Sequence, residues 1–225
     1  MNSKDYIKNA TATESVPASI EIDQVMLHAS LTLMIKAAEL GDLIKRKIYY
    51  GKAFDQAKLK ENLSYVTSVA NFISEGQEAG VDFNTPKTQE EERQGLPAEL
   101  RGISLNNINP RLLHAAIGCF TESGELLDSV IKQYETGVID LVNFKEEVGD
   151  LQWYQAIGCS EIGADLDELR DVNIAKLKAR YPNKFSNEAA LNRDLVAERA
   201  ILEGEQLIYP GGGEIKPSTG VLRSA

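Results

Sequence analysis

The sequence predicts an all-α protein in which two tandem helical hairpins form a bundle with further C-terminal helices. Three observations predict this class. Apolar residues recur at spacings of three and four over most of the chain, as on one face of a helix. Capping residues, glycines and prolines delimit these segments. No segment of any length alternates apolar and polar residues in the manner of a strand.

The capping signals place six helices. They are expected at residues 20–50, 55–76, 110–137, 140–162 and 165–181, with a sixth that starts near residue 186. Asn109 and Pro110 have the residue types of a helix cap and first position, and Gly51 and Gly137 those of helix stops. The predicted organisation is a first hairpin at 20–80, a connector at 81–109, a second half at 110–206 and a flexible tail at 207–225.

The two hairpins resemble each other. Displacing the chain by 86 positions aligns LHASLTLMIKAAELGDLIKRKIYYG with LHAAIGCFTESGELLDSVIKQYETG, so that His28 meets His114 and Gly51 meets Gly137. An internal duplication is the favoured interpretation. Without a gap, the acids Glu122, Glu125, Glu147 and Asp150 of the second copy stand opposite Lys36, Glu39, Glu61 and Ser64 of the first. Because the first copy has lost two acids, any chemistry is assigned to the second.

Two carboxylates of the third predicted helix lie off its apolar stripe. Glu122 and Glu125 are one turn apart in CFTESGELLDSV, and no Lys or Arg occurs between Arg111 and Lys132. The stripe itself comprises Leu113, Ile117, Phe120, Leu127 and Ile131. Such a pair is most often a solvated face, but the neighbours here include Ala115, Gly118 and Thr121. Like charges one turn apart repel, and a bound cation would remove that cost.

The fourth predicted helix supplies a matching pair. Glu147 and Asp150 are again one turn apart, in NFKEEVGDLQWY. Two antiparallel helices would bring the four carboxylates together. Oxygen ligands without His or Cys favour Mg²⁺ or Mn²⁺ over zinc. Such ions can clamp a phosphate chain and activate a bound water.

Basic residues follow on the fifth predicted helix. Asn173, Lys176 and Arg180 lie on one line at helical spacing. They could face the carboxylates and hold a polyanion. Equally, Lys176 and Arg180 could simply complement the C-terminal dipole of a surface helix.

The overall composition restricts the partners. A formal charge of −10 argues against a nucleic-acid polymer but not against a single nucleotide whose charge is met by metal ions. No apolar run is long enough to span a membrane, and the N-terminus lacks the apolar core of a secretory signal. Cys119 and Cys159 form no metal-type spacing and are expected to be reduced packing residues in a cytoplasmic protein.

The motifs resemble those of the MazG-like, all-α nucleoside triphosphate pyrophosphatases. ESGE followed by EVGD resembles that family's E-x-x-E and E-x-x-D pairs. NIAKLKARYPNKFS resembles the segment that follows them, and NRDLVAERAILEGE resembles the tail of phage-encoded members. The resemblance covers residues 110–206, and the first hairpin resembles a degenerate copy of the same unit.

The resemblance implies a function. The expected reaction is the Mg²⁺-dependent hydrolysis of a nucleoside or deoxynucleoside triphosphate between its α- and β-phosphates. Its expected role is to adjust the dNTP pool. By position, the metal ligands would be Glu122, Glu125, Glu147 and Asp150. Glu125 would also polarise the attacking water, and Asn173, Lys176 and Arg180 would hold phosphate or sugar. Trp153 is a candidate surface for stacking the base, or else a core side chain. Simpler members pair hairpins from two chains, whereas here the degenerate copy could serve as the built-in partner and shape the base pocket. A homo-oligomer is also expected.

Two other interpretations of the sequence remain open, and the sequence argues against a third. The chain could be a non-catalytic nucleotide sensor or scaffold derived from a decayed hydrolase, or a purely structural bundle. A ferritin-like di-metal protein would need Glu-x-x-His pairs, and neither His28 nor His114 follows a glutamate by three residues.

Overall fold

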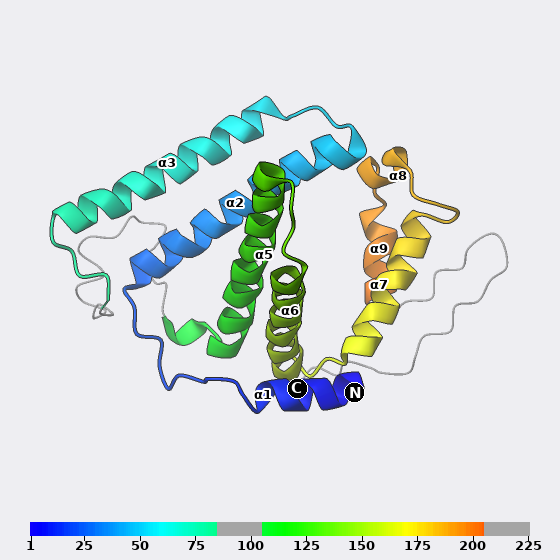
Figure 1. Ribbon diagram of the computed structural model, residues 1–225, viewed down its shortest axis with the longest axis horizontal. Helices are drawn as coiled ribbons and strands as arrows, with labels where there is room; N and C mark the ends of the chain where they lie inside the picture. The colour runs from blue at the N-terminus through cyan, green and yellow to red at the C-terminus, as the bar shows by residue number, and fades with distance from the viewer. Residues whose placement is uncertain (85–104, 205–225) are drawn as a thin grey trace. The chain divides into compact units, whose positions relative to one another are not determined.

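The computed structural model describes residues 1–84 and 105–204, and over them the chain is helical without strands, which confirms the all-α class (Figure 1). Residues 85–104 of the predicted connector and the predicted tail at 207–225 lie outside the described residues. The helices are α1 (Ser3–Thr11), α2 (Gln24–Tyr50), α3 (Gln56–Glu78), the short 3-10 helix η2 (Leu105–Asn107), α5 (Pro110–Thr136), α6 (Leu141–Glu161), α7 (Leu166–Arg180), α8 (Asn187–Leu191) and α9 (Leu195–Leu202).

The ends of α5 follow the predicted capping chemistry. The Asn109 side chain accepts hydrogen bonds from the backbone N–H groups of Arg111 and Leu112, and Pro110 occupies the first turn. Gly137 ends the helix with a positive φ of 75°, a conformation that a side chain disfavours. These local contacts fix where α5 begins and ends.

Helix α2 has the same frame. It contains 27 residues, as does α5, and both its first and last residues lie 86 positions before those of α5 (Gln24 and Pro110, Tyr50 and Thr136). Asp23 caps its start, and Gly51 ends it with φ 66°. The shared frame supports the predicted duplication, which stays a prediction.

The ungapped alignment is off by one residue after these helices. Five residues (51–55) join α2 to α3, but four (137–140) join α5 to α6. Asp55 accepts from the N–H of Lys58, and Asp140 accepts in the same way from Asn143. From these caps onward the equivalent positions are therefore 85 apart. Asn62, not Glu61, corresponds to Glu147, and Tyr65, not Ser64, corresponds to Asp150.

Helices α5 and α6 pack against each other in antiparallel fashion. Near the start of α5, the Ala115 Cβ lies 3.3 Å from the place where a Cβ on Gly158 would stand. One turn later the Tyr154 ring covers Gly118. Near the far end, the Asn143 amide donates to the Ser129 hydroxyl at 3.2 Å. Contacts that advance along α5 while they recede along α6 define an antiparallel hairpin.

The apolar stripe of α5 is not the face that packs on α6. Leu127 is 64% exposed and Ile131 54%, whereas Ala115, Gly118 and Glu122 are buried. Periodicity locates an apolar stripe but does not identify the element that will cover it. The small residues decide the α6 contact, because only they leave room for the Tyr154 ring.

The chain divides into two compact units, one formed by residues 13–158 and the other by the N-terminal segment 1–12 with the segment from residue 159 onward. In the first, α2 and α3 lie side by side (Figure 1). In the second, α7 lies beside α9 and contacts α1. The Ser3 hydroxyl donates to Asp167 at 2.6 Å across the α1–α7 contact. Helix α1, capped by Asn2, was not among the six predicted helices.

The predicted sixth helix is two helices. Ser186 caps α8 by accepting from the N–H of Ala189, and Asp194 caps α9 by accepting from that of Ala197. The chain breaks at 192–194 because a second capping residue is available there. Within residues 1–84 and 105–204, no helix combines the length and hydrophobicity needed to cross a bilayer.

Gly118 is expected to resist replacement even by alanine. An added Cβ would stand 2.1 Å from ring atoms of Tyr154, whereas nothing lies within 4 Å of one on Gly124 in the same helix. Gly118→Ala should therefore destabilise the protein by about 1–3 kcal/mol. Gly124→Ala should stabilise it by up to about 1 kcal/mol through helix propensity alone. Urea unfolding of the two variants measures the difference, and equal stabilities would contradict this packing.

Candidate metal centre

Three of the four predicted ligands come together at the α5–α6 contact. Oxygen atoms of Glu122, Glu147 and Asp150 all lie within 4.8 Å of one another. Glu122 is 9% exposed and Glu147 5%, whereas Asp150 is open to solvent. Two carboxylates of the group are therefore buried, and the third is accessible to solvent.

The fourth predicted ligand, Glu125, is not part of the group. It is exposed on α5, one turn beyond Glu122. Its charge nevertheless reaches the site, since it is one of the influences that raise the pKa of Glu147. The structure thus brings together three carboxylates and leaves Glu125 beside them at the surface.

The α5–α6 packing positions the carboxylates. Glu122 lies one turn beyond Gly118, which the Tyr154 ring covers. The contact between Tyr154 and Gly118 therefore aligns the helices and also directs Glu122 toward α6. The Thr121 hydroxyl donates to the Gly118 carbonyl at 2.9 Å and lies 3.3 Å from the nearer Glu122 oxygen. Glu147 is on the same face of α6 as Tyr154, two turns earlier in the chain.

The group carries uncompensated negative charge. Burial, the charge of Glu125 and the hydrogen bond with the Glu122 carboxyl together raise the pKa of Glu147 to about 6, with burial the largest cause. Burial and the charges of Glu122 and Asp150 also raise the pKa of Tyr154. Among the described residues, none of the three carboxylates has an ion-pair partner.

The donor set fits a hard divalent cation. Carboxylate oxygens are the protein ligands that Mg²⁺, Mn²⁺ and Ca²⁺ prefer, and the group contains no sulfur or imidazole donor. A cation held by Glu122, Glu147 and Asp150 would replace the mutual repulsion by attraction. Exposed Asp150 leaves a side through which a ligand or water could reach it.

Trp153 belongs to an aromatic group in the same unit. Its indole N–H donates to the Thr13 hydroxyl at 3.0 Å. Its ring meets Tyr154 edge-on at 4.9 Å and His114 at 5.8 Å between centroids. These contacts account for His114 and Trp153 as packing residues. The stacking of a base on Trp153 stays a prediction.

The predicted phosphate-binding residues lie in the other unit. Asn173 is exposed, and Lys176 is half-buried and has no ion-pair partner among the described residues. Arg180 is engaged: its guanidinium donates to both oxygens of Glu198, at 2.7 and 2.6 Å. Their roles toward a phosphate remain predictions.

Sequence reasoning missed Glu198. The side chain is only 6% exposed and also accepts from Arg193. Hydrogen bonds from Arg193 and Arg180 lower the pKa of Glu198 to about 2. No spacing rule links positions 180, 193 and 198, because α7 and α9 meet only in three dimensions. An isolated acid on the otherwise apolar first turns of α9 was the one available signal.

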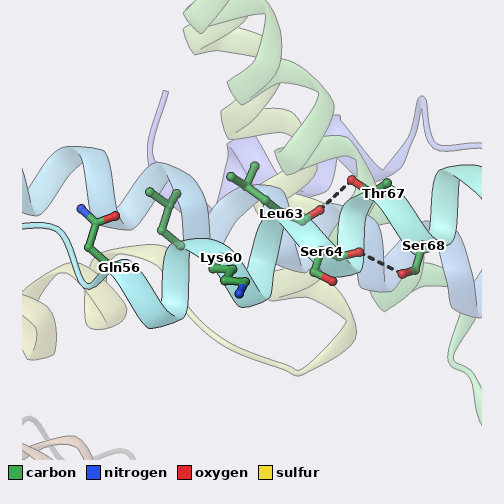
Figure 2. A pocket seen from close by; sticks show the side chains of 7 residues that line it. Gln56, Lys60, Leu63, Ser64, Thr67 and Ser68 are labelled. Carbon is green, nitrogen blue, oxygen red and sulfur yellow. Dashed lines mark hydrogen bonds between the residues drawn. The ribbon is translucent and has the colours of Figure 1, made fainter.

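A separate hollow runs along α3 (Figure 2). Its volume is about 530 Å³, and it is lined by Gln56, Leu59, Lys60, Leu63, Ser64, Thr67 and Ser68. The Thr67 and Ser68 hydroxyls donate to the carbonyls of Leu63 and Ser64 in their own helix (Figure 2). All lining residues come from one helix and none belongs to the predicted site, so we assign it no function.

No family model, curated protein or solved structure matches the chain. The resemblance to MazG-like proteins therefore rests on the quoted motifs alone.

The carboxylates should cost stability when no cation is present. Glu147→Gln removes one buried charge from the group, so we expect its melting temperature in EDTA at pH 7 to exceed that of the wild type. Glu146→Gln changes the exposed neighbour and should leave the melting temperature unchanged. Scanning calorimetry of the three proteins tests this. A Glu147→Gln protein less stable than the wild type in EDTA would show that the carboxylate is a structural contact.

The Glu198 pair predicts a defined acid response. The folded pKa of about 2 lies below the unfolded value near 4.5, so this stabilisation is present above pH 4.5 and is lost as the pH falls toward 2. Glu198→Gln should lower the unfolding free energy by about 3 kcal/mol at pH 6, and the difference should vanish near pH 2. Glu203→Gln, at an exposed pair with Arg199, should change it by less than about 1 kcal/mol throughout. Equal effects of the two variants at pH 6 would contradict this assignment.

Proposed function

We propose that the protein is a metal-dependent pyrophosphohydrolase of nucleoside or deoxynucleoside triphosphates, which acts on the cytoplasmic dNTP pool. The products would be the monophosphate and pyrophosphate. One observation carries the proposal: three carboxylates that the motif predicts as ligands converge within 4.8 Å and have no basic partner among the described residues. Buried like charges are kept where they hold a cation, because neutral side chains would be more stable.

The residues of the site would divide the work. Glu122, Glu147 and Asp150 would hold Mg²⁺ or Mn²⁺. When bound, the metal would neutralise phosphate oxygens and lower the pKa of a coordinated water. Glu125, which is exposed on α5, would accept a proton from the attacking water. In-line placement and charge neutralisation suffice for this reaction, so no protein nucleophile is required.

The remaining roles rest on the family resemblance. It assigns phosphate or sugar contacts to Asn173, Lys176 and Arg180 and the base to Trp153. It also suggests a homo-oligomer. The exposed part of the α5 stripe, which includes Leu127 and Ile131, is apolar surface that a second copy could cover. A monomer by light scattering at micromolar concentration would contradict the oligomer.

The second candidate is a nucleotide sensor or scaffold without catalysis. One observation favours it: at the positions equivalent to the acids, the first hairpin carries Lys36, Asn62 and Tyr65, so loss of ligands has been tolerated in one half. The three retained carboxylates of the second half favour catalysis instead.

Product analysis separates the two candidates. The purified protein with Mg²⁺ is offered each common NTP and dNTP, and the products are resolved by ³¹P NMR and ion-exchange chromatography. We expect monophosphate and pyrophosphate from at least one nucleotide, with the rate reduced at least about 100-fold in Glu122→Gln. Glu146→Gln, at an exposed position next to the site, should retain the wild-type rate.

Other outcomes would contradict the proposal in different ways. Orthophosphate as the direct product would show that the β–γ bond is cut. Saturable nucleotide binding without any turnover would establish the sensor.

A further inference from the structure

Lys36 occupies the position in the first hairpin that Glu122 occupies in the second. Both residues follow the start of a 27-residue helix by the same interval, because α2 and α5 share their bounds at a displacement of 86. Across the hairpin, Lys36 lies over the ring of Tyr65, the residue equivalent to Asp150, with its Nζ 5.9 Å from the centroid. Glu122 likewise faces Asp150. Equivalent positions thus meet in both hairpins.

The counterparts of Glu125 and Glu147 in the first hairpin are Glu39, which pairs with the Lys36 ammonium, and Asn62. The ammonium is 3.3 Å from Glu39, and the two side chains are only 20% and 31% exposed. The Lys36 hydrogen bond is the main influence that lowers the pKa of Glu39. Asn62, the counterpart of Glu147, is 1% exposed. Neither polar atom of its side chain has a hydrogen-bond partner among the described residues.

The contrast between the hairpins lies in charge. At the four equivalent positions the second hairpin has four carboxylates. The first has one carboxylate, one ammonium, an amide and a phenol, and Lys58 lies 3.8 Å from the same carboxylate, so the group carries no net negative charge. An ordinary surface pair would leave the lysine in water. Here the lysine side chain is turned inward over an aromatic ring, where desolvation strengthens its attraction to both partners.

We propose that Lys36 is a built-in cation, which fills in the first hairpin the place that a divalent metal takes in the second. The first hairpin then binds no metal, because the Lys36 ammonium permanently balances the negative charge of Glu39. The chain keeps a single metal centre for the same reason. This inference rests on the metal-binding part of the proposed function and is independent of catalysis.

The test gives the first hairpin a group of three carboxylates, in which Glu39 is the third acid and Asn62 stays an amide. All variants carry Glu147→Gln, which removes one proposed metal ligand from the second hairpin so that its site does not contribute to the signal. Lys36→Glu combined with Tyr65→Asp recreates the acids of Glu122 and Asp150 beside Glu39. We expect a lower melting temperature than the parent in EDTA and a rise of about 3 °C or more when Mn²⁺ is added at about 1 mM. Mn²⁺ binding by electron paramagnetic resonance should appear in parallel.

Two controls keep the test decisive. Lys47→Glu with Tyr49→Asp makes the same chemical changes at exposed positions of α2 and should show no response to Mn²⁺. Lys36→Gln should melt lower than Lys47→Gln, because only the former leaves Glu39 without its nearest cation.

Each failure has its own meaning. If wild type binds Mn²⁺ but the converted hairpin responds no more than its control, the built-in cation is refuted and the metal centre stands. Equal melting temperatures for Lys36→Gln and Lys47→Gln refute it as well. If neither wild type nor the converted hairpin binds Mn²⁺, the metal centre fails and this inference fails with it.

Discussion

Repulsion among carboxylates at the α5–α6 contact is the constraint on which the rest of the structure depends. The Tyr154 ring on Gly118 aligns the two helices, and this alignment brings Glu122, Glu147 and Asp150 together. Burial, together with the neighbouring carboxylates Glu125 and Glu122, raises the pKa of Glu147. Neutral side chains at these positions would avoid the repulsion, and this cost is the reason for proposing that the group holds a cation.

Ion pairs compensate carboxylates among the described residues, and two of these are Glu198 and Glu39. Glu198 is held by Arg180 and Arg193, which makes it a fixed link between α7 and α9. In the first hairpin, the partly exposed Glu39 pairs with Lys36 at 3.3 Å and with Lys58 at 3.8 Å. For Glu122, Glu147 and Asp150 of the second hairpin, we propose that a bound cation supplies the compensating charge. Under this proposal, the second hairpin carries the metal-dependent function and the first is a metal-independent support.

Local chemistry was predictable and spatial partnership was not. Asn109, Pro110 and Gly137 define the ends of α5 through contacts within a few residues, so the sequence located that helix correctly. The i, i+3 carboxylate pairs predicted a group of four acids, of which Glu122, Glu147 and Asp150 converge and Glu125 does not. The one-residue difference in the hairpin loops shifted the alignment, because an ungapped comparison cannot detect an insertion between a stop glycine and a capping aspartate. The face of α5 that packs on α6 depends on Tyr154, a residue distant in sequence.

The most direct test of the metal centre is a Mn²⁺ titration at pH 7, followed by electron paramagnetic resonance. Asp150 is the exposed ligand, so Asp150→Asn weakens the site with least risk to folding. The structure predicts saturable binding by the wild type, weakened at least about tenfold by Asp150→Asn. Asp128→Asn, at an exposed ion pair on α5, should bind as the wild type does. Absence of saturable binding in the wild type, or equal affinity in all three proteins, would contradict a metal centre formed by these carboxylates.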